Sequence, residues 1–257
     1  MIEKPIEIRT ADGTADGYLY QQEGSGRWPG VIYYTDIMGI RPANREIGKR
    51  IAANGYTVLM PNVFYRTTKP PLFDFTPDFT NERTMKRFGE LAGPLTPEAV
   101  ERDAHAYADF LSKQDSVSGA PFGVIGTCFT GAIALRTAAA LPDKIAAFAS
   151  FHGGRLYLDN DPASPHLVLP RVKARLFFAH ATNDRTIPAE AIAKLDEALA
   201  AWGGRYESRI YGATHGWTVP GSPVYNEREA EAAFAKLMEL FSSTLKDPAA
   251  SRSASSV

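Results

Sequence analysis

The chain has 257 residues, with 28 Lys or Arg against 29 Asp or Glu, so its formal net charge is -1. This length can bury a full core in one domain, and the balanced charge without a basic block excludes a surface for tracking nucleic acid. One cysteine excludes an internal disulfide. The chain lacks the apolar run of about 18 residues that a membrane span needs and the pattern of a secretory signal. We therefore expect a cytoplasmic protein with neither membrane nor nucleic-acid partners.

The predicted elements begin with a hairpin, because residues 6–10 and 17–21 flank an Ala-Asp-Gly turn. From residue 30 onward, short apolar runs alternate with patterns of helical period. Strands are predicted at 31–35, 56–60, 122–125, 145–150, 174–179 and 206–211, and helices around Ile47 and Ile51, from Pro97 through Leu111, and at 132–141, 189–202 and 227–245. This alternation predicts a mostly parallel sheet with helices on both faces, which binds ligands at the carboxyl ends of its strands.

Two stretches interrupt the alternation. Residues 62–95 are long for a connection and are rich in phenylalanine and arginine. Long insertions often serve as lids or binding loops, although such aromatic side chains also pack an excursion onto the body. Residues 247–257 are rich in Ala and Ser without an apolar stripe, so we expect a disordered tail. The expected organisation is one α/β domain over residues 1–246 with a lid-like insertion at 62–95.

The single cysteine, Cys128, stands in Gly-Thr-Cys-Phe-Thr-Gly between a predicted strand and a predicted helix. Small residues at such a junction permit the sharp turn of a nucleophile elbow. A thiol there lies at a helix N-terminus, where unpaired amides and the helix dipole favour the thiolate and can stabilise an oxyanion. The alternative is a buried structural cysteine, the commoner role of a lone Cys.

A nucleophilic cysteine needs a base and an acid that orients the base. Among the five histidines, His215 follows the last predicted strand in a loop of small residues, while His152 and His180 end strands and remain candidates for lining the pocket. Asp184 follows the preceding strand, where an Asx turn or a helix cap is the alternative role. Cys128, Asp184 and His215 occur in the nucleophile, acid, histidine order of the α/β-hydrolases.

With these motifs, the chain resembles the dienelactone hydrolase family, the cysteine-using branch of the α/β-hydrolases. The resemblance runs from about residue 6 to residue 241. It implies the α/β-hydrolase fold and a triad of Cys128, Asp184 and His215 that opens small-molecule lactones and other esters through an acyl-thioester, without a cofactor. The matching segments, besides the Cys128 elbow, are 35–39, 60–65, 183–188 and 215–217.

The resemblance also implies roles around the nucleophile. The family places an acidic residue at the position of Asp36, where it helps to activate the thiol. The backbone N–H groups of Ile37 and Phe129 would form the oxyanion hole. Asp36 is shorter than the Glu usual at this position and also fits a turn or capping residue, and Thr130 stands where the family usually has glycine.

Family members that cleave dienelactone bind its carboxylate with arginines, one of them a few residues beyond the histidine. Here Trp217, Thr218 and Val219 occupy that stretch, so Trp217 is a candidate substrate contact. Arg83 and Arg87 of the insertion are the candidate cations. A bulkier or less anionic ester is therefore as good a candidate substrate as dienelactone.

The leading hypothesis is a hydrolase of carboxylic esters or lactones. The competing hypothesis is a non-catalytic α/β-hydrolase scaffold that binds a small molecule, because a fold does not guarantee a function. A metal site is disfavoured, because the lone cysteine and the five histidines show no ligand spacing.

Overall fold

The computed structural model describes residues 1–246, and the predicted tail at 247–257 lies outside them. Over the described range, one eight-stranded sheet has the order β1-β2-β4-β3-β5-β6-β7-β8. The hairpin of β1 (Ile2–Thr10) and β2 (Gly13–Gln21) is antiparallel, as is the pairing of β2 with β4 (Thr57–Pro61). All pairings from β4 to β8 are parallel. The predicted hairpin and mostly parallel sheet are confirmed, and the hairpin strands are longer than predicted.

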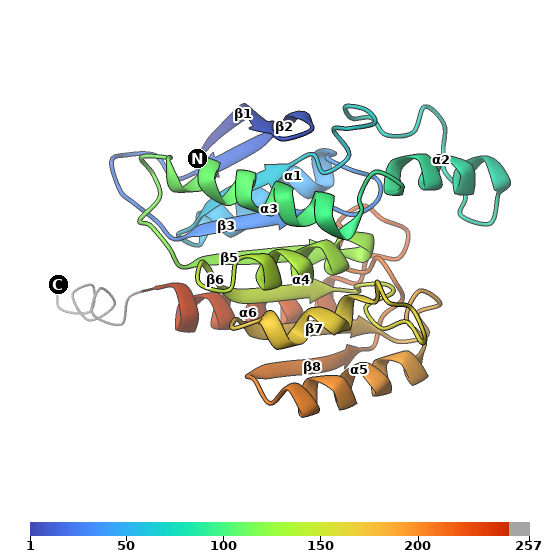
Figure 1. Ribbon diagram of the computed structural model, residues 1–257. Coiled ribbons are helices and arrows are strands. Elements are labelled where there is room, and N and C mark those ends of the chain that lie inside the picture. Colours follow the sequence, from blue (N-terminus) through green and yellow to red (C-terminus); the bar gives the residue numbers. More distant parts are fainter. Residues whose placement is uncertain (247–257) are drawn as a thin grey trace.

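Helices alternate with the remaining strands along the chain (Figure 1). The strands are β3 (Gly30–Tyr34), β5 (Phe122–Thr127), β6 (Ile145–Phe151), β7 (Arg175–Ala181) and β8 (Tyr206–Tyr211). The helices are α1 (Pro42–Ala53), α2 (Glu82–Ala92), α3 (Pro97–Ser112), α4 (Gly131–Ala140), α5 (Ala189–Trp202) and α6 (Glu227–Leu245), with the short 3-10 helices η1 (Cys128–Thr130) and η2 (Pro165–Arg171). No helix in residues 1–246 is long and apolar enough to cross a membrane.

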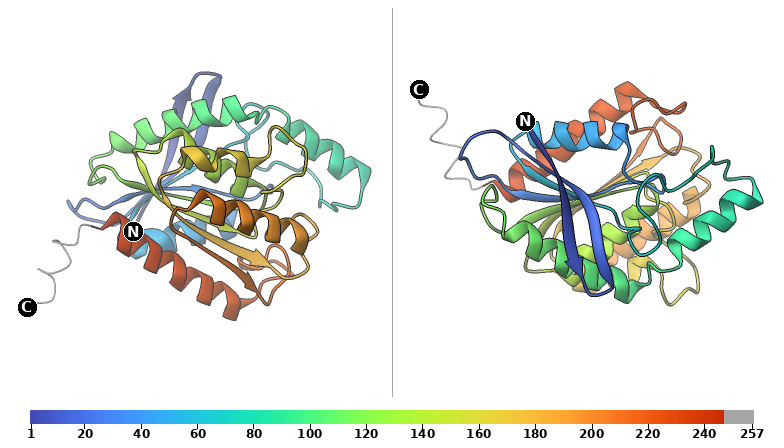
Figure 2. Two further views of the ribbon diagram at one scale, coloured as in Figure 1. Left: turned by 60° about the horizontal axis from the view of Figure 1, so that its bottom comes forward. Right: turned by 90° about the horizontal axis from the view of Figure 1, so that it is seen from above.

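Apart from α2, the helices form two layers, one on each face of the sheet (Figure 2). Helices α3, α4 and α5 contribute to the core on one face, and α1 and α6 to the core on the other. Successive side chains of a strand point to opposite faces, so Phe148 and Phe178 belong to the first core, and Phe151 and Phe177 to the second. Because both faces are covered, the central strands are continuously apolar.

The insertion contains a helix, α2, that the sequence analysis did not predict. Asn81 caps it by accepting a hydrogen bond from the Arg83 N–H, and Thr84 and Leu91 are buried on its inner face. This cap and the spacing of Thr84, Phe88 and Leu91 were visible in the sequence. The insertion is therefore partly helical, while its lid-like role and the single-domain organisation stay predictions.

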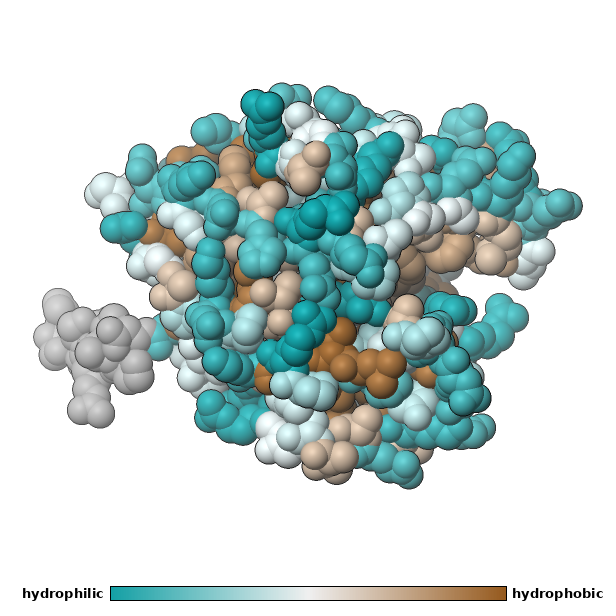
Figure 3. All heavy atoms as spheres, in the orientation of Figure 1, coloured by the Kyte–Doolittle hydropathy of each residue, from teal (hydrophilic) through white to brown (hydrophobic). Residues whose placement is uncertain are grey.

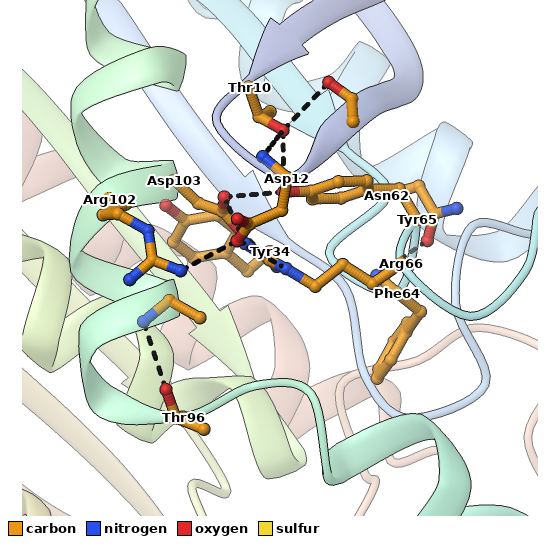
Figure 4. A network of polar contacts seen from close by, with 12 residues as sticks. Thr10, Asp12, Tyr34, Asn62, Phe64, Tyr65, Arg66, Thr96, Arg102 and Asp103 are labelled. Carbon is orange, nitrogen blue, oxygen red and sulfur yellow. Dashed lines mark hydrogen bonds and ion pairs between the residues drawn. The ribbon is translucent and has the colours of Figure 1, made fainter.

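A partly buried polar network anchors the beginning of the insertion (Figure 4). The Arg66 guanidinium donates to both carboxylate oxygens of Asp103, at 2.7 and 2.8 Å, and also to Asp12. The Tyr65 hydroxyl donates to Asp103 and accepts from Thr10. These bonds join the β1–β2 hairpin, the insertion and α3.

Candidate active site

Cys128 lies at the tip of a sharp turn between β5 and η1. Its φ of 57° is in the left-handed region, which residues other than glycine rarely adopt. The turn needs Gly126, because a Cβ there would lie 2.2 Å from the Thr130 carbonyl oxygen. The strained backbone lifts the partly exposed thiol above the carboxyl edge of the sheet.

Thr130, the departure from the usual glycine, is fully buried in this turn. Its hydroxyl accepts the Thr127 N–H at 3.0 Å and lies 3.0 Å from the Tyr34 carbonyl oxygen, which can accept its proton. The Thr127 hydroxyl also donates to Tyr34, at 3.3 Å. The threonine therefore fits by tying the elbow to the neighbouring strand β3.

The fold brings Cys128, Asp184 and His215 together from loops that follow β5, β7 and β8. His215 Nε2 lies 3.1 Å from Cys128 Sγ, and His215 Nδ1 lies 2.6 Å from Asp184 Oδ2. The other carboxylate oxygen of Asp184 accepts from the Thr186 N–H at 2.8 Å and from its hydroxyl at 2.6 Å. Asp184 thus forms the Asx turn, its alternative role, with one carboxylate oxygen. With the other oxygen it contacts His215.

These contacts shift the pKa values of the histidine and the acid. Burial lowers the pKa of His215, but the bonds to Asp184 and Cys128 outweigh it and raise this pKa to about 10. Burial raises the pKa of the Asp184 carboxyl, but the His215 and Thr186 bonds outweigh it and bring this pKa below its usual value. At neutral pH the site therefore pairs an imidazolium with a carboxylate on one side and with sulfur on the other.

The two backbone N–H groups predicted to bind an oxyanion follow the neighbouring strands β3 and β5. Ile37 follows β3, which lies beside β5, and its N–H has no hydrogen-bond partner within the described residues. Phe129 is the second residue of η1, and the first N–H groups of a helix have no partner inside it. The role of these two groups as an oxyanion hole stays a prediction.

Comparisons with known proteins identify the family of this chain. The model of the dienelactone hydrolase family matches residues 15–245. The chain belongs to this family. It is 30% identical over 213 residues to a carboxymethylenebutenolidase of Rhodococcus opacus, over 80% of this chain and 78% of that protein. A Synechocystis protein provisionally given the same name is 26% identical over 235 residues, covering 90% and 92% of the two chains.

The fold agrees as well. A provisionally named dienelactone hydrolase from Klebsiella pneumoniae superposes with a TM-score of 0.83 over 94% of this chain and 98% of its own, at 21% identity. This likeness confirms the predicted α/β-hydrolase fold. Together with the family match, it makes the protein a hydrolase of carboxylic esters or lactones.

Asp36, the acidic residue that the family resemblance places near the nucleophile, is held by Arg41. The guanidinium donates to its two oxygens at 2.6 and 2.8 Å. The Met38 N–H also bonds to Asp36, at 2.9 Å. Within residues 1–246, no hydrogen bond joins Asp36 to Cys128. The carboxylate bonds within the turn that carries the Ile37 N–H, and its role in activating the thiol stays a prediction.

Arg41 is a charged neighbour of the site that the sequence analysis did not identify. It comes just before α1 and is partly exposed. Burial lowers its pKa, while Asp36 and the nearby Cys128 contribute to a net rise. The sequence shows Arg41 and a proline five and six residues after Asp36. The contact between the Arg41 guanidinium and Asp36 is visible only in the structure.

The two candidate arginines of the insertion have partners there. Arg83 pairs with Asp74 at 3.3 Å and lies over the Phe75 ring at 3.9 Å. Arg87 donates to the Leu72 carbonyl at 3.0 Å and pairs with Glu90 at 3.0 Å. Both line an open groove of about 480 Å³ whose lining does not include the triad.

The cleft above the thiol is bordered by α2. Phe88 of this helix packs edge-on against Phe129 with ring centroids 5.5 Å apart, and Phe64 stacks on Phe129 at 6.4 Å. Figure 3 shows the surface hollowed at the right-hand edge, between α2 and the loops after the parallel strands. The residue after the nucleophile therefore forms an apolar wall together with the insertion.

Trp217 is fully buried and stacks on Tyr211 at 4.8 Å, which removes it from contact with a substrate and corrects that expectation. His152 is fully buried too, and its ring centroid lies 5.0 Å from that of His215 and 6.2 Å from that of Trp217. Burial lowers the pKa of His152 to about 3, so it is neutral. The His152 ring therefore packs against both His215 and Trp217.

His180 is buried in β7, and burial lowers its pKa to about 4. It stacks on Phe178 with ring centroids 6.0 Å apart, so it belongs to the core. Across residues 1–246, no group of three His, Cys, Asp or Glu side chains is arranged to hold a metal ion.

Proposed function

We propose that the protein cleaves its ester or lactone by nucleophilic catalysis, with Cys128 as nucleophile, His215 as acid and base, and Asp184 as the orienting acid. The observation that carries the proposal is the distance of 3.1 Å from His215 Nε2 to Cys128 Sγ, with Asp184 bonded to the opposite nitrogen. This is the geometry that an activated cysteine nucleophile requires.

In the first step the Cys128 thiolate attacks the carbonyl carbon. The developing oxyanion is bound by the N–H groups of Ile37 and Phe129. The tetrahedral intermediate collapses to an acyl-thioester, and the His215 imidazolium donates its proton to the departing alkoxide. For a lactone the released alcohol stays attached to the acyl group.

In the second step water hydrolyses the thioester. Neutral His215 removes a proton from the water as it attacks, and the oxyanion forms in the same hole. Collapse releases the carboxylic acid, the sulfur leaves as a thiolate, and His215 is again protonated. Asp184 stabilises the imidazolium in both half-reactions and holds the ring in one orientation.

We further propose an uncharged, apolar acyl or alcohol group as the preferred substrate element. Arg41, Arg83 and Arg87 each have a carboxylate partner. Phe88 and Phe129 present apolar surface at the cleft. The name of the Rhodococcus opacus relative refers to an anionic lactone, and this chain lacks the arginine expected after His215. The insertion at 62–95 would act as a lid-like cover over this apolar wall.

Replacing Cys128 with Ala tests the mechanism. On a panel of neutral aryl, alkyl and lactone substrates, C128A should lose about 10⁶-fold in kcat, as other enzymes do when the nucleophile is removed. Unchanged circular dichroism and melting temperature control for folding. In the wild type, mass spectrometry after a rapid acid quench should find the acyl group on Cys128. Turnover by C128A at the wild-type rate would contradict the proposal.

A further inference from the structure

A cavity of about 110 Å³ lies on the face of the sheet opposite α4, between α1 and α6. Its walls are apolar side chains of both helices and of the strands beneath them. They include Ile47, Ile125, Phe151, Phe234 and Leu237. Figure 2 shows α1 and α6 on this same face. An apolar cavity of about 150 Å³ can hold one benzene ring, and this cavity is smaller, so a single ring is the largest apolar group that fits it.

The charged residues at the rim of the cavity are already paired. Arg50 donates to Glu231 at 2.6 Å and lies over the Phe234 ring at 3.7 Å. Glu46 bonds to Lys49 at 2.9 Å. Arg50 and Glu231 are both about half exposed, so this pair lies on the solvent side of the cavity. A neutral ligand fits such a cavity better than a charged one, because burying an unpaired charge is costly.

The cavity also offers a polar contact. Thr218 is one of its lining residues, and its hydroxyl lies 2.8 Å from His152 Nε2. His152 Nδ1 has no hydrogen-bond partner in the described part of the chain. A neutral imidazole carries one N–H. When His152 carries this proton on Nε2, it donates the hydrogen bond to the Thr218 hydroxyl oxygen. The Thr218 proton is then available to an oxygen atom of a ligand in the cavity.

The same contact leads to the candidate active site. His152 packs against His215, with ring centroids 5.0 Å apart. Thr127, another lining residue, directly precedes Cys128. The lining does not include Cys128, Asp184 or His215, so the cavity is separate from the cleft. A molecule bound here would contact Thr127, which precedes Cys128, and Thr218, which is bonded to His152.

We propose that this cavity is a regulatory binding site for a neutral, single-ring molecule that carries one hydroxyl or carbonyl oxygen. The ring lies between α1 and α6, and the oxygen accepts a hydrogen bond from Thr218. Occupancy changes the reactivity of Cys128 through Thr218, His152 and His215. The binding site stands on the cavity alone, whereas this coupling rests on the proposed function.

Phenol is the probe for binding, measured by isothermal titration calorimetry. Wild-type protein should bind one phenol saturably. Ala230→Leu, which fills the cavity from α6, should abolish binding, whereas Ala232→Leu, the same change at an exposed position of that helix, should retain it. Thr218→Val should weaken binding about tenfold, and Thr218→Ser should weaken it less. Absence of binding to wild type, or wild-type binding by folded Ala230→Leu, would overturn the site.

The coupling is measured on the same samples. Because the chain has one cysteine, iodoacetamide labels Cys128 unambiguously. Saturating phenol should change the labelling rate about fivefold in wild type, within the range of ordinary allosteric coupling, and leave it unchanged in Ala230→Leu. Phenol that binds without changing this rate would overturn the regulatory role. C128A that binds phenol but shows wild-type turnover would contradict the proposed mechanism and leave the binding site intact.

Discussion

Two buried carboxylates in this protein make ion pairs of similar length that have different consequences. Asp103 binds Arg66 at 2.7 and 2.8 Å, and Asp184 binds His215 at 2.6 Å. The guanidinium stays charged and directs its donors to Asp103 and Asp12, so the network of Figure 4 has no reactive atom. The imidazole titrates, and its second nitrogen faces a thiol. A buried ion pair therefore indicates chemistry only when one partner can exchange a proton and an adjacent atom can react.

The largest expected effect is on kcat, when the negative charge of Asp184 is removed. Asp184→Asn leaves the shape of the site but can no longer stabilise the imidazolium, and the corresponding change in a serine triad lowers kcat by about 10⁴-fold. We expect a loss of this order in ester hydrolysis, with little change in KM. An activity within tenfold of wild type would show that His215 does not depend on Asp184.

The same change at the other pair should affect stability and spare catalysis. Asp103→Asn leaves the Arg66 charge, 11% exposed, without its main partner, and breaking a buried pair typically costs about 3 kcal/mol. Urea unfolding should show this loss, while kcat per folded molecule remains near the wild-type value. A large fall in kcat without destabilisation would place this network in the catalytic machinery.

A smaller effect is expected at the elbow. Thr130→Val removes the acceptor of the buried Thr127 N–H, which should cost about 2 kcal/mol of unfolding free energy. Thr130→Ser keeps the hydroxyl and is the matched control. If Val and Ser unfold at the same urea concentration, the hydroxyl does not hold the elbow to β3.

The fold was largely predictable because its signals are local. Short apolar runs and helical periods mark β3 through β7 and their connecting helices, and the small residues around Cys128 mark the turn between β5 and α4. Helix α2 was not predicted, although Asn81 is a typical N-cap and the spacing of Thr84, Phe88 and Leu91 indicates a helix. The aromatic residues of the insertion favoured a lid or binding loop over a helix.

The candidate site was predictable where chain order determines position. Parallel strands end at one edge, so loops after β5, β7 and β8 bring Cys128, Asp184 and His215 together. Contacts that depend on how a side chain turns were not predictable. The sequence cannot reveal that Arg41 folds back onto Asp36 or that Trp217 points into the core.

The pH dependence of Cys128 alkylation tests the central claim most directly. The pKa of His215 is raised from its usual 6.5 to about 10, so the imidazolium persists across this interval and can pair with a thiolate. An ordinary thiol is half ionised at a pH of about 8.5. Iodoacetamide should therefore label wild-type Cys128 rapidly even at pH values well below this. The rate should stay nearly constant until the imidazolium loses its proton near pH 10. His215→Gln should restore the profile of an ordinary thiol. Identical profiles for wild type and His215→Gln would contradict the account.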